Sequence, residues 1–178
     1  MRAFIFLISI LTISACKTKV DSVNPAENNV KEEIKGLESE CPEAGVCTVE
    51  LFKNKDLTIK EDGTGALYPE LVDGANVVVQ YTYSVKGPEG TVDGDYSETI
   101  HFEVPASAET LNLKDADLKN LKLVFGKHCY CKGEAGYYFV EKGNLTVNKS
   151  TDALSFSLTF EMEHPEHQIN TIVSSSSL

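Results

Sequence analysis

The sequence predicts an all-β fold, a mostly antiparallel β-sandwich or barrel-like domain that is held by disulfides and follows a flexible tether. One reason is that apolar and polar residues alternate in several runs between residues 47 and 162. A period of two is typical of strands that bury one face and expose the other, as in antiparallel sheets. The other reason is the turn pairs between these runs, at a spacing that suits about nine or ten strands.

The chain begins with a leader, "MRAFIFLISILTISAC". Arg2 gives it a positive start, and residues 3–13 form an apolar run that is too short to span a bilayer as a helix. The small residues before Cys16 complete a pattern that resembles the lipobox of bacterial lipoproteins. This resemblance implies that residues 1–15 are a signal peptide and that Cys16 becomes the acylated N-terminus. The alternative is an ordinary secretory signal, which favours an A-x-A-like cleavage site.

A lipidated Cys16 implies a stable membrane anchor, because each buried methylene contributes about 0.8 kcal/mol. Lys17 follows the cysteine, where some inner-membrane lipoproteins have aspartate. By resemblance to the sorting rules of this class, we expect the cell envelope, and the outer membrane rather than the inner one. Exposure at the cell surface stays open.

Composition and charge divide the rest of the chain. Residues 17–40 are polar and charged, so we expect residues 16–40 to be a lipidated tether, residues 41–174 a single β domain and residues 175–178 a frayed tail. The net charge of −11 repels phosphate backbones, which argues against nucleic acid as a partner. The expected partners are the lipid bilayer, through acylated Cys16, and an envelope protein or ligand that the sequence does not identify.

The expected strands follow one another after residue 41. Their buried positions are Cys47, Val49 and Leu51; Val77, Val79, Tyr81, Tyr83 and Val85; Ile100, Phe102 and Val104; and Leu154, Phe156, Leu158, Phe160 and Met162. The polar positions between them, including His101 and Glu103, are expected on solvated faces. Turns are expected at Asp62-Gly63, Asp73-Gly74, Asp93-Gly94 and Gly143-Asn144, and one helical turn between residues 115 and 121.

Four cysteines remain after Cys16, namely Cys41, Cys47, Cys129 and Cys131. An exported chain meets oxidising conditions, so we expect these four to form two disulfides. Residues two apart on an extended strand have Cα atoms about 6.5–7 Å apart, which is at the upper limit for a bridge. We therefore favour two bridges between the Cys41–Cys47 segment and the Cys129–Cys131 segment, while the two local pairings stay open.

The stretch "CYCKGEAGYYFVEKGNLTV" is similar to a segment of uncharacterised envelope lipoproteins of Bacteroidota-type bacteria. The positions that carry this similarity are Cys129, Cys131, Gly133, Gly136-Tyr137-Tyr138 and Gly143-Asn144-Leu145. The resemblance implies a location and a shared scaffold, and it implies no activity.

No catalytic or metal-binding residue is assigned from the sequence, and no cofactor is expected. A metal site of His128, Cys129, Cys131, His164 and His167 is disfavoured, because structural zinc sites space their cysteines differently and Pro165 interrupts the histidine pair. A redox pair is disfavoured because C-x-C is not C-x-x-C. The paired acids of "KDADLKN" and "VDGDYS" are read as turn residues rather than as calcium ligands.

The candidate binding residues are the three tyrosines near the second cysteine pair, Tyr130, Tyr137 and Tyr138. A loop closed by a disulfide can present such rings at low entropy cost. The alternative is that Tyr137 or Tyr138 belongs to the core. The chain has no tryptophan, the residue that most often stacks on sugars, so carbohydrate binding is disfavoured. We therefore expect a membrane-anchored envelope lipoprotein whose β domain binds or scaffolds without catalysis; the alternative is an envelope hydrolase or other enzyme with an unrecognised site.

Overall fold

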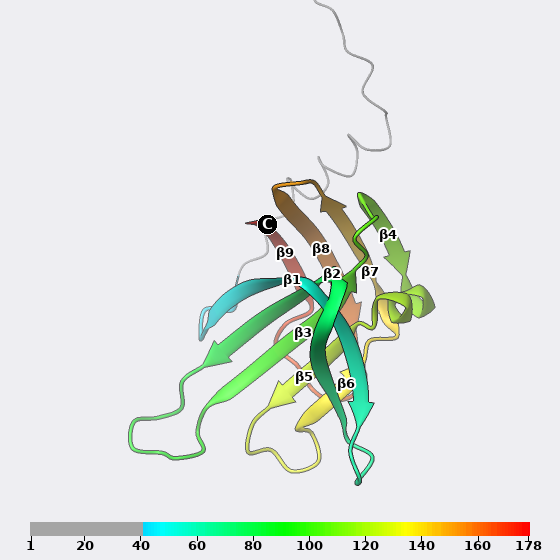
Figure 1. The fold of residues 1–178 in the computed structure, drawn as a ribbon. Helices are drawn as coiled ribbons and strands as arrows, with labels where there is room; N and C mark the ends of the chain where they lie inside the picture. The colour runs from blue at the N-terminus through cyan, green and yellow to red at the C-terminus, as the bar shows by residue number, and fades with distance from the viewer. Residues whose placement is uncertain (1–40) are drawn as a thin grey trace, which may run out of the picture.

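The computed structural model describes residues 41–178, which fold into nine strands and one short helix (Figure 1). The elements are β1 (Val46–Glu61), β2 (Leu67–Val85), β3 (Tyr96–Val104), β4 (Thr110–Lys114), η1 (Asp115–Leu121), β5 (Val124–His128), β6 (Gly136–Phe139), β7 (Lys142–Lys149), β8 (Ala153–Glu161) and β9 (Thr171–Ser177). The expected signal peptide, the tether and Cys16 lie outside the described residues.

The strands form two antiparallel sheets. Sheet A has five strands in the order β1-β2-β3-β5-β6, and sheet B has four strands in the order β4-β7-β8-β9. The two sheets pack as a sandwich (Figure 1), so the all-β, antiparallel architecture predicted from the alternating pattern is confirmed.

The main core lies between the two sheets. Its largest fully buried side chains include Tyr83, Phe102, Phe125 and Phe156. Phe102 of sheet A meets Phe156 of sheet B edge to face, with ring centroids 5.2 Å apart. Aromatic pairs prefer this geometry, and the burial of such large side chains is the main force that holds the sheets together.

Sheet A also curls, which encloses a second and smaller core on its outer face. β2 is long enough to pair with β1 and β3 and to meet β6 again at Leu67, opposite Tyr137. The curl begins at a bulge where the register between β1 and β2 shifts after Lys53. The residues buried beneath the curled part include Leu57, Val78 and Val124.

Two turns that the sequence predicted are instead parts of strands. Asp73-Gly74 lies in the bulge within β2, where Asp56 Oδ1 accepts hydrogen bonds from the backbone N–H groups of Ala75 and Asn76. Gly143-Asn144 lies inside β7 and pairs with β8. In both places ladder and side-chain hydrogen bonds outweigh the local preference for a turn.

The chain end is ordered rather than frayed, so the prediction for residues 175–178 is wrong. β9 extends to Ser177, which pairs with Ala153, and Leu178 donates its backbone N–H to the carbonyl of Asp152 at 2.8 Å. Pairing with β8 satisfies the backbone N–H and C=O groups of β9, and this pairing does not depend on the polar serine side chains.

The predicted helical turn is present as the 3₁₀-helix η1, which buries Leu118 and Leu121 and ends at Lys122 in the left-handed conformation. In the described part of the chain, no helix has the length and apolar character that a membrane crossing requires.

Replacing Gly126 by alanine should destabilise the domain by about 1–3 kcal/mol, as is usual for overpacking. A Cβ at this position would lie 2.5 Å from both Thr99 Oγ1 and the Tyr137 ring. Gly63→Ala is the matched control, since a Cβ there meets nothing within 4 Å. Chemical unfolding of both variants measures the difference, and equal unfolding free energies would contradict the close packing of Tyr137 on β5.

Candidate functional site

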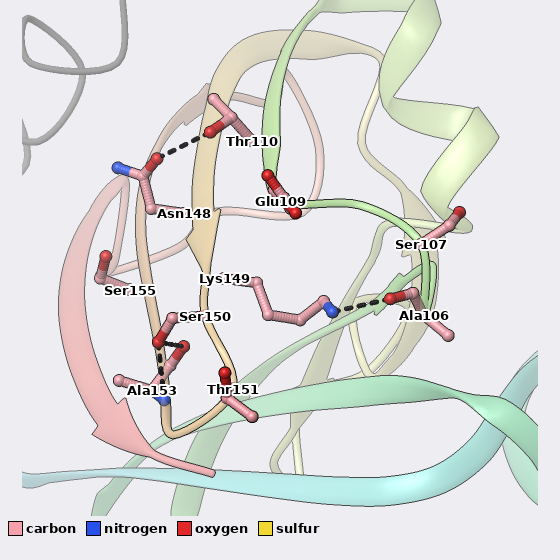
Figure 2. A pocket seen from close by; sticks show the side chains of 10 residues that line it. All are labelled: Ala106, Ser107, Glu109, Thr110, Asn148, Lys149, Ser150, Thr151, Ala153 and Ser155. Atoms are coloured by element: carbon pink, nitrogen blue, oxygen red, sulfur yellow. Dashed lines mark hydrogen bonds between the residues drawn. The ribbon is translucent and has the colours of Figure 1, made fainter. Parts of the chain in front are cut away.

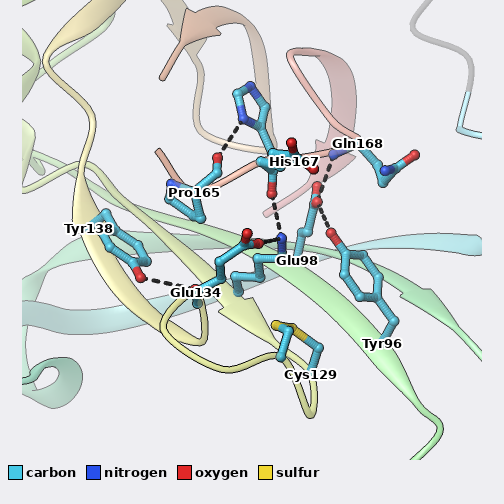
Figure 3. A network of polar contacts seen from close by, with 11 residues as sticks. Tyr96, Glu98, Cys129, Glu134, Tyr138, Pro165, His167 and Gln168 are labelled. Carbon is cyan, nitrogen blue, oxygen red and sulfur yellow. Dashed lines mark hydrogen bonds and ion pairs between the residues drawn. A yellow bond between two sulfur atoms is a disulfide. The ribbon is translucent and has the colours of Figure 1, made fainter. Parts of the chain in front are cut away.

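A buried carboxylate lies at the end of the sandwich where the β8–β9 connection crosses sheet A (Figure 3). Glu98 of β3 faces the core and accepts hydrogen bonds from the backbone N–H groups of Gln168 and Ile169, at 2.7 and 2.9 Å. It also accepts a short hydrogen bond from the hydroxyl of Tyr96. Burial and this carboxylate raise the pKa of Tyr96. The carboxylate therefore fixes the connection to the sheet.

Lys127 of β5 lies directly opposite Glu98 in the sheet. Only 7% of its side chain is exposed, and its ammonium donates to the Glu134 carboxylate and, at 2.7 Å, to the carbonyl of Glu166. The hydrogen bond from Lys127 holds the pKa of Glu134 below its usual value. The network of Glu98, Lys127, Glu134 and their partners joins β3 and β5 to two loops, residues 129–135 and 162–170 (Figure 3).

The cysteines pair locally, Cys41 with Cys47 and Cys129 with Cys131. The cross-bridges favoured from the sequence are therefore wrong. β5 ends at His128, so Cys129 and Cys131 lie in a turn where their Cα atoms are 5.2 Å apart, rather than on an extended strand. The Cys41–Cys47 pair has its Cα atoms 5.8 Å apart and packs against the core.

The three candidate tyrosines do not form one patch. Tyr130 stands at the tip of the loop that the Cys129–Cys131 bond closes, and 90% of it is exposed. Tyr138 packs against the core and donates its hydroxyl to the carbonyl of Glu134 at 2.9 Å. Tyr137 lies on the opposite face of β6, where its ring contacts His101 and His128. Of the three, Tyr130 alone is free to meet a partner.

A second polar cluster, the histidine cluster, lies beneath the curled part of sheet A and contains His101, His128 and Tyr137. The Tyr137 ring meets both imidazoles edge to face, with centroids 6.0 Å from His101 and 5.2 Å from His128. His101 is 4% exposed, and its Nδ1 has no hydrogen-bond partner among the described residues. Burial, with a smaller effect of His128, lowers the pKa of His101 to about 4; burial also lowers the pKa of His128.

Glu103 is the second buried carboxylate of β3, on the face opposite to Glu98. It accepts from the backbone N–H of Leu57 at 2.6 Å, from Lys122 Nζ at 3.0 Å and from Asn76 Nδ2 at 3.1 Å. The sequence placed His101 and Glu103 on a solvated face, which is wrong, because the curled β1–β2 hairpin and β6 cover that face.

A polar hollow of about 680 Å³ lies beside the β3–β4 loop and the β7–β8 hairpin (Figure 2). Lys149 Nζ donates to the carbonyl of Ala106 at 2.8 Å, and Thr110 donates its hydroxyl to Asn148 Oδ1 at 3.1 Å. The amide nitrogen of Asn148 is buried and has no partner among the described residues.

The residues considered for a metal site are separate or engaged elsewhere. The two cysteines are bonded to each other, and His167 stacks on Phe160 with centroids 5.4 Å apart. His164 meets Tyr138 edge to face. Within residues 41–178, no group of three or more histidine, cysteine, aspartate or glutamate side chains is placed to hold a metal ion.

Sequence reasoning missed Glu98, Lys127 and Asn148. The pattern contained a signal for the first two, because Glu98 shares the face of Ile100 and Phe102, and Lys127 shares that of Phe125. A charged residue at an apolar position predicts a buried and paired charge. Asn148 gives no such signal, because amides are also common on solvated faces.

Comparison with other proteins does not assign a function to this arrangement. No protein-family model, no curated protein and no solved structure matches the chain. The function is therefore inferred from the sequence and from the geometry of the domain.

Replacing His101 by phenylalanine should flatten the dependence of stability on pH. His101 has a pKa of about 4 when folded and about 6.5 when unfolded. As the pH drops, His101 therefore takes up a proton in the unfolded chain before it does so in the folded one. The free energy of unfolding falls between about pH 6.5 and about pH 4, by about 3 kcal/mol in total. Phenylalanine keeps a ring beside Tyr137 and removes this titration.

Urea unfolding of the parent and of His101→Phe between pH 4 and pH 7 measures this effect. Val46→Ala, at an exposed position, is the control and should keep the slope of the parent. If His101→Phe also keeps that slope, the imidazole is not buried in the neutral form.

Proposed function

We propose that this chain is a lipid-anchored protein of the bacterial cell envelope, and that its β domain binds another envelope component without catalysing a reaction. The leader supports the anchor: a positive residue, a short apolar run and small residues precede Cys16, as in the lipobox. The location supported best is the outer membrane.

The cysteine pairs support export from the cytosol. Cys41 is bonded to Cys47, and Cys129 is bonded to Cys131. Disulfides persist in oxidising compartments such as the periplasm and the cell surface, and they are rare in a reducing cytosol. The two disulfides within residues 41–178 are typical of an exported domain.

One observation carries the binding role, namely the exposure of Tyr130 on a loop that is fixed at its base. The Cys129–Cys131 bond closes the loop, and the ion pair of Lys127 with Glu134 ties it to β5. Tyrosine is enriched at binding hot spots because its large ring loses little conformational freedom on binding. The fold itself gains nothing from exposing this ring.

The buried ionisable groups favour binding over catalysis. Glu98, Glu103 and Lys127 each make two or more hydrogen bonds to backbone or side-chain groups of the domain. A catalytic acid or base needs a free side to face a substrate. These three charges therefore serve the scaffold.

Both parts of the proposal are tested by placing a photo-crosslinking amino acid at position 130 in cells fed with labelled palmitate. We expect the chain to carry the label and to give a discrete crosslinked product. Cys16→Ser should remove the label and release the protein from the membrane fraction.

The control carries the same crosslinker at the exposed Asn120 of η1 and should not give that product. An unlabelled parent would contradict the anchor. Equal crosslinking from positions 120 and 130 would contradict a binding role for Tyr130.

A further inference from the structure

The outer face of sheet B carries an ordered array of uncharged polar side chains. Twelve positions form three rows across β4, β7, β8 and β9: Thr110, Asn148, Ser155 and Ser175; Asn112, Thr146, Ser157 and Val173; Lys114, Asn144, Thr159 and Thr171. All but Lys114 and Val173 are serine, threonine or asparagine. We call these twelve residues the polar face.

The composition of the polar face is not explained by solubility. The whole chain has a net charge of −11 and 24% charged residues, yet the polar face contains one charge, Lys114, among its twelve positions. The next row on the same side of sheet B, Lys142 opposite Glu161, is charged and marks the end of the polar face. Solvated sheet faces are ordinarily kept soluble by interspersed charges. The scarcity of charge within the three rows points to a partner that is itself neutral and polar.

The asparagines of the polar face hold free donors. Thr110 donates to Asn148 Oδ1 and Thr146 donates to Asn112 Oδ1, each at 3.1 Å, so both amide oxygens are occupied. Asn148 is 8% exposed, its Nδ2 has no partner among the described residues, and Figure 2 shows that nitrogen pointing away from Thr110. A buried donor without a partner has lost its hydrogen bonds to water, and a ligand acceptor would replace them.

The polar face is also hollowed along its length. The hollow of about 680 Å³ includes Asn148 and Ser155 of the first row. A second, of about 390 Å³, includes Thr146 and Ser157 of the middle row. A third, of about 500 Å³, includes Thr171 of the last row and lies at the charged end of the face, where Lys142 and Glu161 also line it. A repeating run of hollows suits a chain-like ligand with repeating groups.

We propose that the polar face binds a neutral polysaccharide. Each sugar unit offers hydroxyls that donate and accept hydrogen bonds, which matches an array of hydroxyls and amides, and it carries no charge that the polar face would have to neutralise. Nucleic acids and acidic polymers need cations to bind, and an apolar partner needs apolar area. This inference is independent of the lipid anchor and of the Tyr130 loop.

The mode of binding differs from aromatic stacking, which the lack of tryptophan disfavours. Here the affinity comes from hydrogen bonds, each of which contributes little by itself because it replaces a hydrogen bond to water. Single sugars therefore bind weakly, and chains that cover all three rows bind better because the contacts are linked.

Affinity electrophoresis of the exported chain tests the proposal. The gels contain dextran, mannan, xylan, β-glucan or galactan as neutral probes, and alginate or hyaluronate as anionic ones. We expect retardation by at least one neutral polysaccharide and by neither anionic one. The double variant Thr146→Val/Asn148→Ala should lose at least tenfold in affinity, which corresponds to about 1.4 kcal/mol.

Two further variants separate loss of binding from loss of fold. Asn112→Ala/Thr159→Val changes exposed positions of the polar face, so it should fold like the parent and still lose binding. Thr48→Val changes an exposed threonine of β1 in sheet A and should bind like the parent. Retardation by no neutral probe, or equal retardation of all variants, would overturn the proposal.

Two further measurements on the same protein test other occupants of the polar face, namely a second copy of the chain and the chain's own N-terminal segment. If sedimentation shows a dimer that Asn112→Ala/Thr159→Val abolishes, the face is an interface between copies of the chain. If nuclear Overhauser contacts join the face to residues 17–40, it holds the chain's own N-terminal segment. Either result would overturn polysaccharide binding.

Discussion

Strand β3 carries a buried carboxylate on each of its faces, and the parts of the domain are joined through these two groups. Glu98 holds the backbone of Gln168 and Ile169 inside the sandwich, while Glu103 holds the backbone of Leu57 beneath the curl of sheet A. A buried charge costs several kcal/mol unless hydrogen bonds offset its desolvation. If either segment separated from β3, a buried carboxylate would lose its hydrogen-bond donors. Both segments are therefore held firmly to β3.

This constraint explains how a small domain presents surfaces with different chemistry. The network at Glu98 and Lys127 fixes the base of the loop that exposes Tyr130, and the anchored β8–β9 connection sets the position at which β9 joins sheet B. Because sheet B gives most of its apolar side chains to the core on one face, the other face is left mainly to polar groups that the core does not need. The two functions that we propose use separate surfaces, the loop that carries Tyr130 and the polar face, so one does not block the other.

The alternating residues predicted the strands and a sandwich or barrel-like domain, because a period of two reports which face of a strand is buried. They did not predict that β3 is buried on both faces, since the cover over His101 depends on the curl of the β1–β2 hairpin and on β6, which no local pattern reports. The same limit applies to the cysteines: the pairing of Cys129 with Cys131 depends on β5 ending at His128, and strand ends are set by tertiary contacts. Tyr130 was identified as a candidate, whereas Asn148 was not, because the burial of Asn148 depends on its neighbours in β4 and β8.

Hydrogen exchange of individual amides tests the anchoring role of β3 most directly. If Glu98 holds the β8–β9 connection, the amides of Gln168 and Ile169 will exchange only through global unfolding, with the same free energy as the amide of Phe102 in the core. In Glu98→Gln, these two amides should lose that protection before the amides of β7 and β8 do. If they exchange in the parent as fast as an unstructured chain, the buried carboxylate does not anchor the connection and the account is wrong.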